Sequence, residues 1–506
     1  MNYFDWIGKW SVYTPDKVAV RCADSDGCYT YKELHQEALR LEAYLQNELN
    51  ITQGDRIAVL GQHSIEYLIL FIAAQRMGAI LVPLNYRSSV PEFVYCLKDT
   101  EPALLVFDLG TFGDLNDKIQ EQISVKGLSF QEMFQAASGF EAVETKKEIL
   151  PEQPVFIFYT SGTTGKPKGV VYTNKMLFWN SLNTSVQLEI TSKDSTLNVL
   201  PPYHTSGWNV LVLPMLHRGA RVDFMRAFKA KRVLDYLQKE KISLFLAIPT
   251  MLKMMAGKSC FSDFKAPHLK YMVVGGESLS VSLIDTWAQK GVLLRQGYGL
   301  TEAGPCITSL HHHDALWKKG SIGKLNFYVD HRILDEEGRE VATGTPGELC
   351  LSGNIVTPGY WNNSAYTLEK IKDGWFYTGD IVSMDDAGFM YIHGRKNQMF
   401  ISGGENIYPS EIENVLIKSE FVREVAVLGV PDENWGETGV AFVVPVNRDV
   451  SEEQLFHLMK QHLASYKIPK AIVFLESLPK IGIGKIDRQS LKKKYKSITH
   501  EKKNIS

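Results

Sequence analysis

Long hydrophobic runs are absent from this chain of 506 residues. The longest uninterrupted apolar run is Tyr67–Ala74, and Gln75 and Arg76 follow it directly, whereas a membrane-spanning helix needs about 20 apolar residues. The N-terminus has no basic segment leading into an apolar one, which is the pattern of a secretory signal. The last residues match no lipidation or retention signal. We therefore expect a cytoplasmic protein without a transmembrane segment.

Cysteine is scarce, and no two cysteines form a C-x-x-C pair. This excludes a disulfide framework and gives no support to a cysteine-based zinc site. We expect six free thiols in a reducing compartment. They are Cys22, Cys28, Cys96, Cys260, Cys306 and Cys350.

An excess of one charge sign is also absent. The chain has 55 basic and 57 acidic residues and a net charge of −2, which argues against a general binder of nucleic acids or membrane surfaces. The charges are unevenly distributed, because the residues from Arg395 onward include 17 basic and 14 acidic side chains (+3). The remainder has 38 basic and 43 acidic side chains (−5).

Strand-like and helix-like segments alternate along most of the chain. Residues 56–60 read as a buried strand, 64–77 as an amphipathic helix and 80–84 as the next strand. Further strands of this kind are expected at 103–107, 155–159, 244–248 and 271–274. This alternation predicts parallel sheets covered by helices on both faces. Residues 140–153 read as a solvated connection.

Beyond residues 347–351 the pattern changes to short strands and glycine turns. A smaller unit follows Gly394-Arg395, and at this length two or more domains are expected. Its expected elements are a helix at 410–418, strands at 424–430 and 440–446, and a helix at 451–464. We predict an α/β protein with a large body and a C-terminal lid of about 110 residues.

The strongest local pattern is Tyr159–Gly169, which contains three glycines, two lysines and, between Thr160 and Thr164, four Ser or Thr hydroxyls. It follows the apolar residues 155–158, so it leaves the carboxyl end of an expected strand, where α/β sheets bind ligands. Glycines let a backbone fold closely round an anion, and hydroxyl and ammonium groups can meet phosphate oxygens. It is not a Walker A loop, because no Ser or Thr follows Gly165-Lys166.

Seven segments in this order resemble the motifs of the adenylate-forming superfamily, which includes acyl-CoA synthetases, nonribosomal adenylation domains and beetle luciferases. They are Tyr159–Gly169, Pro202–Gly207, Gly275–Glu277, Gln296–Glu302, Gly374–Asp380, Gly394–Glu413 and Pro479–Lys485. The chain is most similar to bacterial fatty-acyl-CoA and arylalkanoate–CoA ligases. The resemblance implies a domain 1–394 of stacked α/β sheets with a small barrel-like β subdomain, and a mobile α+β domain 395–506.

The motifs suit the activation of a carboxylate by ATP. Attack on the α-phosphorus brings two anions together, so positive charge and Mg²⁺ are needed. Lys168 and the loop hydroxyls would hold the β- and γ-phosphates, and Thr301 the α-phosphate. Glu302 supplies a hard oxygen ligand for Mg²⁺, and the resemblance implies that Thr160 assists.

Tyr298 can stack on adenine between its flanking glycines, and Asp380 can accept the ribose hydroxyls with help from Arg395. The remaining nucleotide-binding assignments are Ser161, Gly162, Thr163, Thr164, Gly165, Gly275, Gly276, Glu277, Gly297 and Gly299.

Lys485 lies in a glycine-bounded loop near the end of the chain. The resemblance implies that its ammonium contacts the substrate carboxylate and the α-phosphate during adenylate formation. It also implies a hinge at Asn397, about which the C-terminal domain rotates between half-reactions. After rotation, Gly403 and Gly404 would flank the pantetheine thiol of CoA, since glycines permit close backbone approach.

The acid pocket is assigned through His204, which the resemblance implies lies beside the substrate carboxylate. Trp208 and the apolar residues 210–216 could line an acyl channel, although Trp208 is equally a candidate for core packing. Glu277 favours a substrate with a polar group if its side chain enters the pocket, and implies nothing if it points to adenine.

Three consecutive histidines, His311–His313, resemble a metal cluster by composition. Adjacent histidines on a loop cannot easily face one ion, and no cysteine or carboxylate spacing supports zinc. We therefore do not expect a metal site here.

The leading interpretation is an acid–CoA ligase that makes an acyl-adenylate from a medium- or long-chain fatty acid and transfers the acyl group to CoA. Its small-molecule partners are ATP, CoA and the acid, and a homodimer is left open. An aryl or o-succinylbenzoate-type CoA ligase is an alternative, as is a stand-alone adenylation enzyme that loads a carrier protein. A non-catalytic nucleotide-binding regulator is disfavoured, because Lys168, Glu302, Asp380 and Lys485 are all present.

Overall fold

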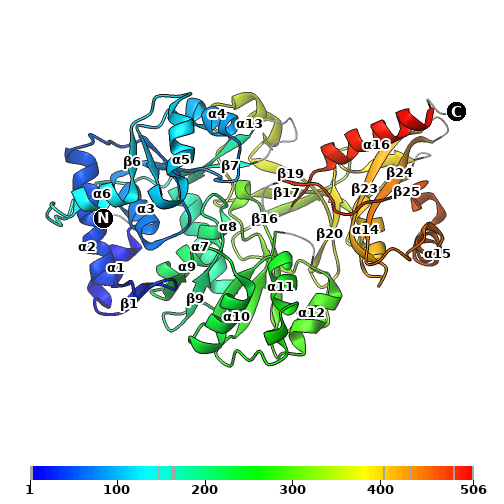
Figure 1. Cartoon of the computed structure of the whole chain (residues 1–506), viewed down its shortest axis with the longest axis horizontal. Coiled ribbons are helices and arrows are strands. Elements are labelled where there is room, and N and C mark those ends of the chain that lie inside the picture. Colours follow the sequence, from blue (N-terminus) through cyan, green and yellow to red (C-terminus); the bar gives the residue numbers. More distant parts are fainter. Residues whose placement is uncertain are drawn as a thin grey trace. The chain divides into compact units, whose positions relative to one another are not determined.

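The computed structural model describes residues 4–145, 147–160, 167–276, 279–402, 405–432, 435–481 and 485–503 (Figure 1). The chain forms two compact units. The larger contains residues 1–279, 284–330 and 351–376, and the smaller contains residues 280–283, 331–350 and 377–506. The hinge at Asn397 and the boundary after residue 394 stay predictions.

A nine-stranded sheet forms one layer of the larger unit. Its strands from β13 to β1 are mutually parallel, and antiparallel strands close both edges. In spatial order the strands are β15 (Lys324–Leu325), β14 (Thr308–Ser309), β13 (Leu294–Tyr298), β12 (Tyr271–Val274), β11 (Leu244–Ala247), β9 (Ser195–Asn198), β10 (Arg221–Phe224), β1 (Val18–Cys22) and β2 (Cys28–Thr30).

A six-stranded sheet forms a second layer, and only its last pair is antiparallel. The order is β6 (Gly127–Ser129), β5 (Leu104–Phe107), β3 (Arg56–Leu60), β4 (Ile80–Pro83), β7 (Pro154–Thr160) and β8 (Lys168–Thr173). The prediction of parallel sheets with helices is confirmed, and β3 and β12 have the expected bounds. Apolar runs bounded by polar residues define these buried strands clearly.

Helix α3 (Ile65–Met77) is buried along nearly its whole length and contacts strands of both sheets. The hydroxyl of Ser64 accepts a hydrogen bond from the backbone N–H of Tyr67 and caps its start, and Gly78 ends it with a φ of 76°. Because all its faces are covered, α3 belongs to the core between the sheets, so the prediction of an amphipathic helix here is wrong.

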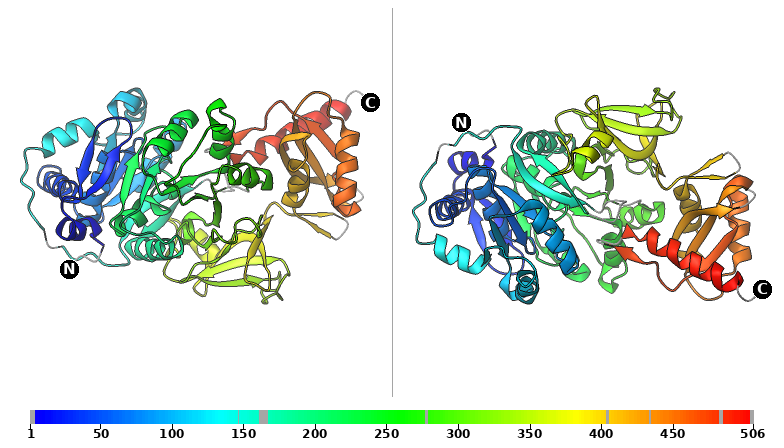
Figure 2. Two further views of the ribbon diagram at one scale, coloured as in Figure 1. Left: turned by 90° about the horizontal axis from the view of Figure 1, so that it is seen from below. Right: turned by 90° about the horizontal axis from the view of Figure 1, so that it is seen from above.

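The other helices of the larger unit complete its layers (Figure 2). They are α1 (Trp6–Tyr13), α2 (Tyr31–Asn47), α4 (Val90–Thr100), α5 (Leu109–Gln120), α6 (Phe130–Ala137), α7 (Asn174–Gln187), α8 (Ser206–Asn209), α9 (Val212–His217), α10 (Ala230–Lys239), α11 (Pro249–Ala256), α12 (Val281–Ala288) and α13 (Ser364–Lys370). Short 3-10 helices lie at η1 (Ser259–Phe261) and η2 (Thr301–Ala303).

The connection at residues 140–153 is held to the body and is not simply solvated. Glu144 pairs with His35 and with the buried Arg76, at 2.6 and 3.0 Å. Arg76 also pairs with Glu42 and Asp5. A buried guanidinium needs such partners, so the connection contributes to a buried ion network.

A third sheet follows the two large layers. Its order is β16 (Asp330–Leu334), β17 (Gly347–Ser352), β19 (Trp375–Met384) and β18 (Ile371–Lys372), with β20 (Met390–Arg395) on β19. This matches the change to short strands expected beyond residue 347.

The smaller unit also contains a sheet with the order β22 (Glu405–Ile407), β21 (Phe400–Ser402), β24 (Gly436–Pro445) and β23 (Val422–Asp432), and β25 (Ala471–Phe474) pairs with β24. One face packs on α14 (Pro409–Ile417) and α15 (Glu452–His462), and the other on Leu491 of α16 (Arg488–Lys503). The last strands are β26 (Lys480–Ile481) and β27 (Lys485–Ile486), and η3 spans Ser465–Lys467.

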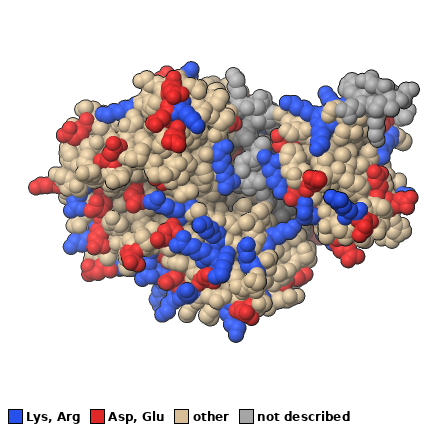
Figure 3. Space-filling view, viewed as in Figure 1, with Lys and Arg blue, Asp and Glu red and all other residues tan. Residues whose placement is uncertain are grey.

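The structure bears on some of the predictions drawn from scarce residues. None of the helices in the described part of the chain has the length and hydropathy to cross a bilayer. All six cysteines are free thiols. Figure 3 shows side chains of both charge signs over the visible face, as expected from a net charge of −2.

Candidate active site

The β7–β8 hairpin positions Thr160 and Lys168. These two residues are register partners at its tip, and the Thr160 hydroxyl donates to the Lys168 carbonyl at 3.4 Å. The apolar residues 155–158 are buried in the sheet, so the hairpin projects from the carboxyl end of β7. This is the edge at which α/β sheets bind ligands.

Lys168 carries an enclosed ammonium group. Its Nζ is buried, has no hydrogen-bond partner among the described residues, and lies 3.7 Å from the centre of the Tyr366 ring. Burial lowers the pKa of Lys168, whereas the carboxylates of Glu369 and Glu302 act to raise it. A buried cation without an acceptor is costly unless an anion binds it, so this group fits a phosphate.

Glu302 lies on η2 and is oriented by neighbours from residues 357–361. The Tyr360 hydroxyl donates to Oε1 of Glu302 at 3.1 Å, and the Thr357 backbone N–H donates to the Glu302 carbonyl at 2.7 Å. A carboxylate has about four acceptor positions, so one bond leaves capacity for a ligand. Hard carboxylate oxygens of this kind fit Mg²⁺.

The segment 357–361 also connects Glu302 to the hairpin. The backbone N–H of Trp361 donates to the Gly169 carbonyl at 2.7 Å, and that of Val171 donates to the Gly359 carbonyl at 3.1 Å. The structure therefore brings Thr160, Lys168 and Glu302 into one region of the larger unit.

Glycines clear space where β12 and β13 end side by side. A Cβ added at Gly275 would lie 3.1 Å from the Gly297 carbonyl oxygen, and one added at Gly299 would lie 1.8 Å from that of Pro305. Gly276 has a φ of 86°, which favours glycine. Tyr298 is half-buried between Gly297 and Gly299, so the predicted adenine platform lies at the carboxyl ends of parallel strands.

His204 lies in the turn that follows β9, the strand between β10 and β11. Its carbonyl accepts from the Gly207 backbone N–H at 2.9 Å. Its ring centre lies 4.6 Å from that of Tyr203, which in turn lies 4.8 Å from that of Tyr86. His204 therefore stands beside a row of aromatic rings at the same sheet edge.

Trp208 belongs to the core. It is fully buried, donates from Nε1 to the Pro202 carbonyl at 2.7 Å, and packs against Phe71 and Phe156. His63 lies 4.2 Å from its ring and donates to the Gly207 carbonyl at 3.1 Å. Of the two interpretations of Trp208, core packing is the correct one.

Asn180 links the end of α8, the helix that follows the His204 turn, to the loop after Glu302. Its Nδ2 donates to the Asn209 carbonyl at 2.6 Å, and its Oδ1 accepts from the Cys306 backbone N–H at 3.3 Å. Asn180 is fully buried, so these bonds are shielded from water and fix the spacing of the two loops.

Asp380 and Arg395 come together in the smaller unit. They are register partners on β19 and β20, and Nε of Arg395 lies 2.6 Å from Oδ1 of Asp380. The Thr378 hydroxyl accepts from the Asp380 backbone N–H at 3.0 Å. The carboxylate is buried while the guanidinium is about half exposed, which is a suitable acceptor geometry for a polar ligand.

Several predicted residues fall outside the described part of the chain. They are Ser161, Gly162, Thr163, Thr164, Gly165, Glu277, Gly403 and Gly404. Lys485 is described by its backbone in β27. Thr301 begins η2 directly before Glu302.

Sequence reasoning missed Tyr360, Tyr366, Asn180 and His63. The run Gly359-Tyr360-Trp361, a glycine followed by two aromatic residues, is a signal that could have pointed to Tyr360. The other three gain their roles from contacts with residues distant in sequence, for which no local pattern exists.

Two family models match the chain. The model described as AMP-binding enzyme matches residues 9–361, and the model described as AMP-binding enzyme C-terminal domain matches residues 411–485.

Known relatives extend over nearly the whole chain. An indoleacetate–CoA ligase from Aromatoleum aromaticum is 34% identical, covering 97% of this chain and 98% of the relative. A long-chain-fatty-acid–CoA ligase from Mycobacterium tuberculosis is also 34% identical, covering 92% and 93%. The structure of o-succinylbenzoate coenzyme A synthetase from Bacillus subtilis with ATP and magnesium superimposes with a TM-score of 0.88 at 28% identity, covering 96% and 99%.

Proposed function

The chain belongs to the AMP-binding enzyme family and is an ATP-dependent acid–CoA ligase that uses Mg²⁺, and from this premise we propose that its acid is a medium- or long-chain fatty acid. The acid and ATP give an acyl-adenylate and pyrophosphate. The CoA thiol then attacks the acyl carbon, and AMP leaves.

The observation that carries the site assignment is the enclosed Lys168 ammonium beside Glu302. Lys168 holds the β- and γ-phosphates and so offsets the repulsion between the attacking carboxylate and the triphosphate. Glu302, oriented by Tyr360, holds Mg²⁺ with help from Thr160. The ion supplies charge neutralisation for the departing pyrophosphate.

The nucleoside-binding assignments follow from the sequence resemblance. Tyr298 stacks on adenine, and the space cleared at Gly275 and Gly297 lets the base approach the backbone. Asp380 accepts the ribose hydroxyls, with Arg395 holding its carboxylate in place. His204 orients the substrate carboxylate at the end of β9.

An arylalkanoic acid is the second candidate. The aromatic row that runs from Phe112 through Tyr86 and Tyr203 to His204 favours it, because successive rings are 5.3, 4.8 and 4.6 Å apart. Flat acids stack on such rings, whereas alkyl chains gain only from apolar burial.

A panel of fatty, arylalkanoic and o-succinylbenzoic acids, assayed by CoA-dependent AMP release, tests the substrate. The highest kcat/KM is expected for a fatty acid of medium or long chain. A preference of tenfold or more for an arylalkanoic acid would replace the first candidate by the second. A thioester formed only with a holo-carrier protein would instead favour a carrier-loading enzyme.

Lys485→Ala tests the division between half-reactions. Adenylate formation should be abolished, because the point charge between carboxylate and α-phosphate is removed. Supplied acyl-adenylate should still react with CoA. The two rates are measured by acid-dependent pyrophosphate exchange and by acyl-CoA release, and loss of both would refute the assignment of Lys485.

A further inference from the structure

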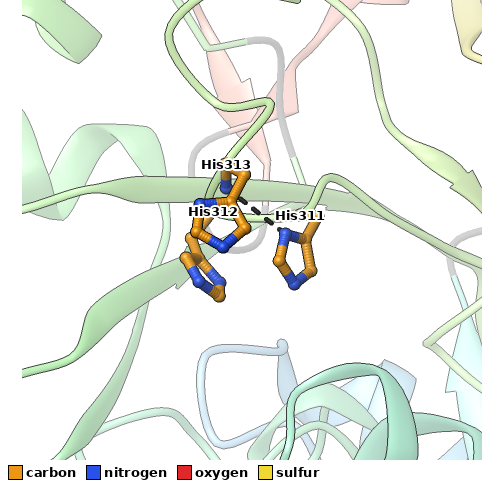
Figure 4. Close-up of side chains that lie close together, drawn as sticks. All are labelled: His311, His312 and His313. Atoms are coloured by element: carbon orange, nitrogen blue, oxygen red, sulfur yellow. Dashed lines mark hydrogen bonds between the residues drawn. The ribbon is translucent and has the colours of Figure 1, made fainter.

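The three consecutive histidines lie close together, contrary to the expectation from their sequence. One ring nitrogen from each of His311, His312 and His313 lies within 4.8 Å of the others (Figure 4). The ring centres are 4.0 to 4.9 Å apart. The chain turns from His312 onward, and this turn brings side chains together that an extended loop would separate.

A carboxylate sets the orientation of the first ring. Nε2 of His311 lies 3.2 Å from Oε1 of Glu189, and Nδ1 of His311 accepts from the His313 backbone N–H at 3.3 Å. Because Nε2 donates to Glu189, the lone pair of His311 is on Nδ1, and a bound ion would have to displace the weak hydrogen bond from the His313 backbone N–H there. A carboxylate on the second ring nitrogen is the arrangement that commonly orients metal-binding histidines.

The second ring has a buried nitrogen that no hydrogen bond satisfies. Nδ1 of His312 is enclosed and has no hydrogen-bond partner among the described residues. Its ring lies parallel to that of Tyr271, at 5.9 Å. An enclosed polar atom without a partner is unfavourable unless a ligand binds it.

Arg295 connects the segment that carries the histidines to the segment that carries Glu189. It is fully buried, and its guanidinium donates to the Leu310 carbonyl at 3.0 Å and to the Gln187 carbonyl at 2.8 Å. Leu310 directly precedes the histidines, and Gln187 lies two residues before Glu189. The positive charge of Arg295 opposes a second cation, and the Glu189 carboxylate offsets it.

We propose that His311, His312 and His313 bind one divalent transition ion that prefers imidazole, represented by Zn²⁺, and that Glu189 positions the first ligand. Tetrahedral coordination at Zn–N distances of about 2.0–2.1 Å separates ligand atoms by about 3.4 Å, so the rings must close by about 1.4 Å at most. Imidazole nitrogens select such ions over Mg²⁺.

This site is separate from the proposed catalytic one. Leu310 pairs with Gln296 on β13, so the histidines lie toward the start of that strand, whereas Tyr298 lies at its carboxyl end. Three residues of strand separate them, or about 10 Å. The bound ion would therefore stabilise the turn after β14, which Glu189 connects to the segment after α7. It would take no part in the ligase reaction, which uses Mg²⁺.

Calorimetric titration with Zn²⁺, on the full chain freed of any histidine tag and in excess Mg²⁺, tests the proposal. We expect one equivalent bound per chain. The His311→Gln/His313→Gln variant should bind at least tenfold more weakly, and Glu189→Gln about tenfold more weakly. The His457→Gln/His462→Gln variant removes two exposed histidines elsewhere and should bind like the wild type.

A second readout reports the coordination itself. Co²⁺ in place of Zn²⁺ should give visible absorption bands typical of four-coordinate cobalt in the wild type, and these should be lost in His311→Gln/His313→Gln. Circular dichroism checks that each variant is folded. Equal affinities in the wild type and that variant, or loss of binding only in the control variant, would overturn the proposal.

Discussion

At the scale of single residues, Lys168 has the most distinctive environment of the candidate site. Its ammonium is enclosed, lies over the Tyr366 ring and meets no hydrogen-bond acceptor in the described part of the chain. We expect Lys168→Met to lower kcat/KM for ATP by about 10- to 100-fold, since charge-assisted hydrogen bonds contribute about 1.5–3 kcal/mol. Steady-state kinetics with varied ATP measures this change.

Lys370 provides a matched control for Lys168. Its ammonium lies 5.8 Å from the centre of the same Tyr366 ring, whereas the Lys168 ammonium lies 3.7 Å from it. Lys370→Met should change kcat/KM for ATP by less than about threefold, as expected for a partly exposed charge that already pairs with Glu369 at 3.8 Å. Equal losses in both variants would mean that general charge, and not the enclosed ammonium, binds the phosphates.

Tyr360→Phe tests the orientation of Glu302. The variant removes the hydroxyl that donates to Oε1 at 3.1 Å and keeps the ring. Loss of one hydrogen bond of about 1 kcal/mol should raise the half-saturating Mg²⁺ concentration about fivefold. Mg²⁺ titration of the initial rate provides the measurement.

The control for Tyr360 is Tyr236→Phe, which removes another tyrosine–carboxylate bond. Tyr236 donates to Asp223 at 2.9 Å on β10, away from the residues assigned to Mg²⁺. This variant should lower stability without changing the Mg²⁺ dependence. An unchanged Mg²⁺ dependence in Tyr360→Phe would contradict the positioning role.

At the scale of elements, α1 is attached to α9 through a stacked pair. The rings of Trp6 and His217 lie 3.9 Å apart and nearly parallel, and Nδ1 of His217 lies 2.9 Å from the Ser181 hydroxyl. Burial and the charge of Arg218 lower the pKa of His217 to about 4. The contact therefore holds a neutral imidazole.

The pKa of His217 predicts a loss of stability in acid. Between about pH 6.5 and pH 4 the unfolded chain binds a proton at this residue and the native chain does not. The free energy of unfolding therefore falls by about 1.4 kcal/mol for each unit by which the pH is lowered. His217→Asn should remove this part of the slope, measured by urea unfolding across the pH range. His268→Gln, at an exposed position, should keep the slope, and a slope unchanged in His217→Asn would contradict the prediction.

The bounds of a helix or strand were predictable where one short run of residues determines them. The strands β3 and β12 follow from apolar runs with polar boundaries, and the start of α3 follows from Ser64. Two-residue strands such as β15 and β18 depend on pairing partners distant in sequence. The same limit applies to the site, because Glu302 is oriented by Tyr360, which lies 58 residues further along the chain.

At the scale of the whole molecule, the position of the hinge stays a prediction. The contact-based division places residues 331–350 and 377–506 together in the smaller unit, whereas the sequence resemblance predicts a hinge at Asn397. Both Arg395 and Lys396 are fixed on one side of this position, through the Asp380 carboxylate and through the Gly379 carbonyl and Glu348. A rotation there would leave intact the Asp380–Arg395 pair that we propose binds the ribose.

Asn397→Pro should change the rates of the two half-reactions unequally if the backbone angles of Asn397 differ between them. Proline fixes φ near −65° and restricts the preceding residue, Lys396. One conformation is then favoured. The ratio of the rate of acid-dependent pyrophosphate exchange to the rate of CoA-dependent acyl transfer should therefore differ at least tenfold from the wild-type ratio. Asn397→Gly leaves φ free and should keep the wild-type ratio. Equal changes in both half-reactions of Asn397→Pro would show that the backbone at this residue does not switch between them.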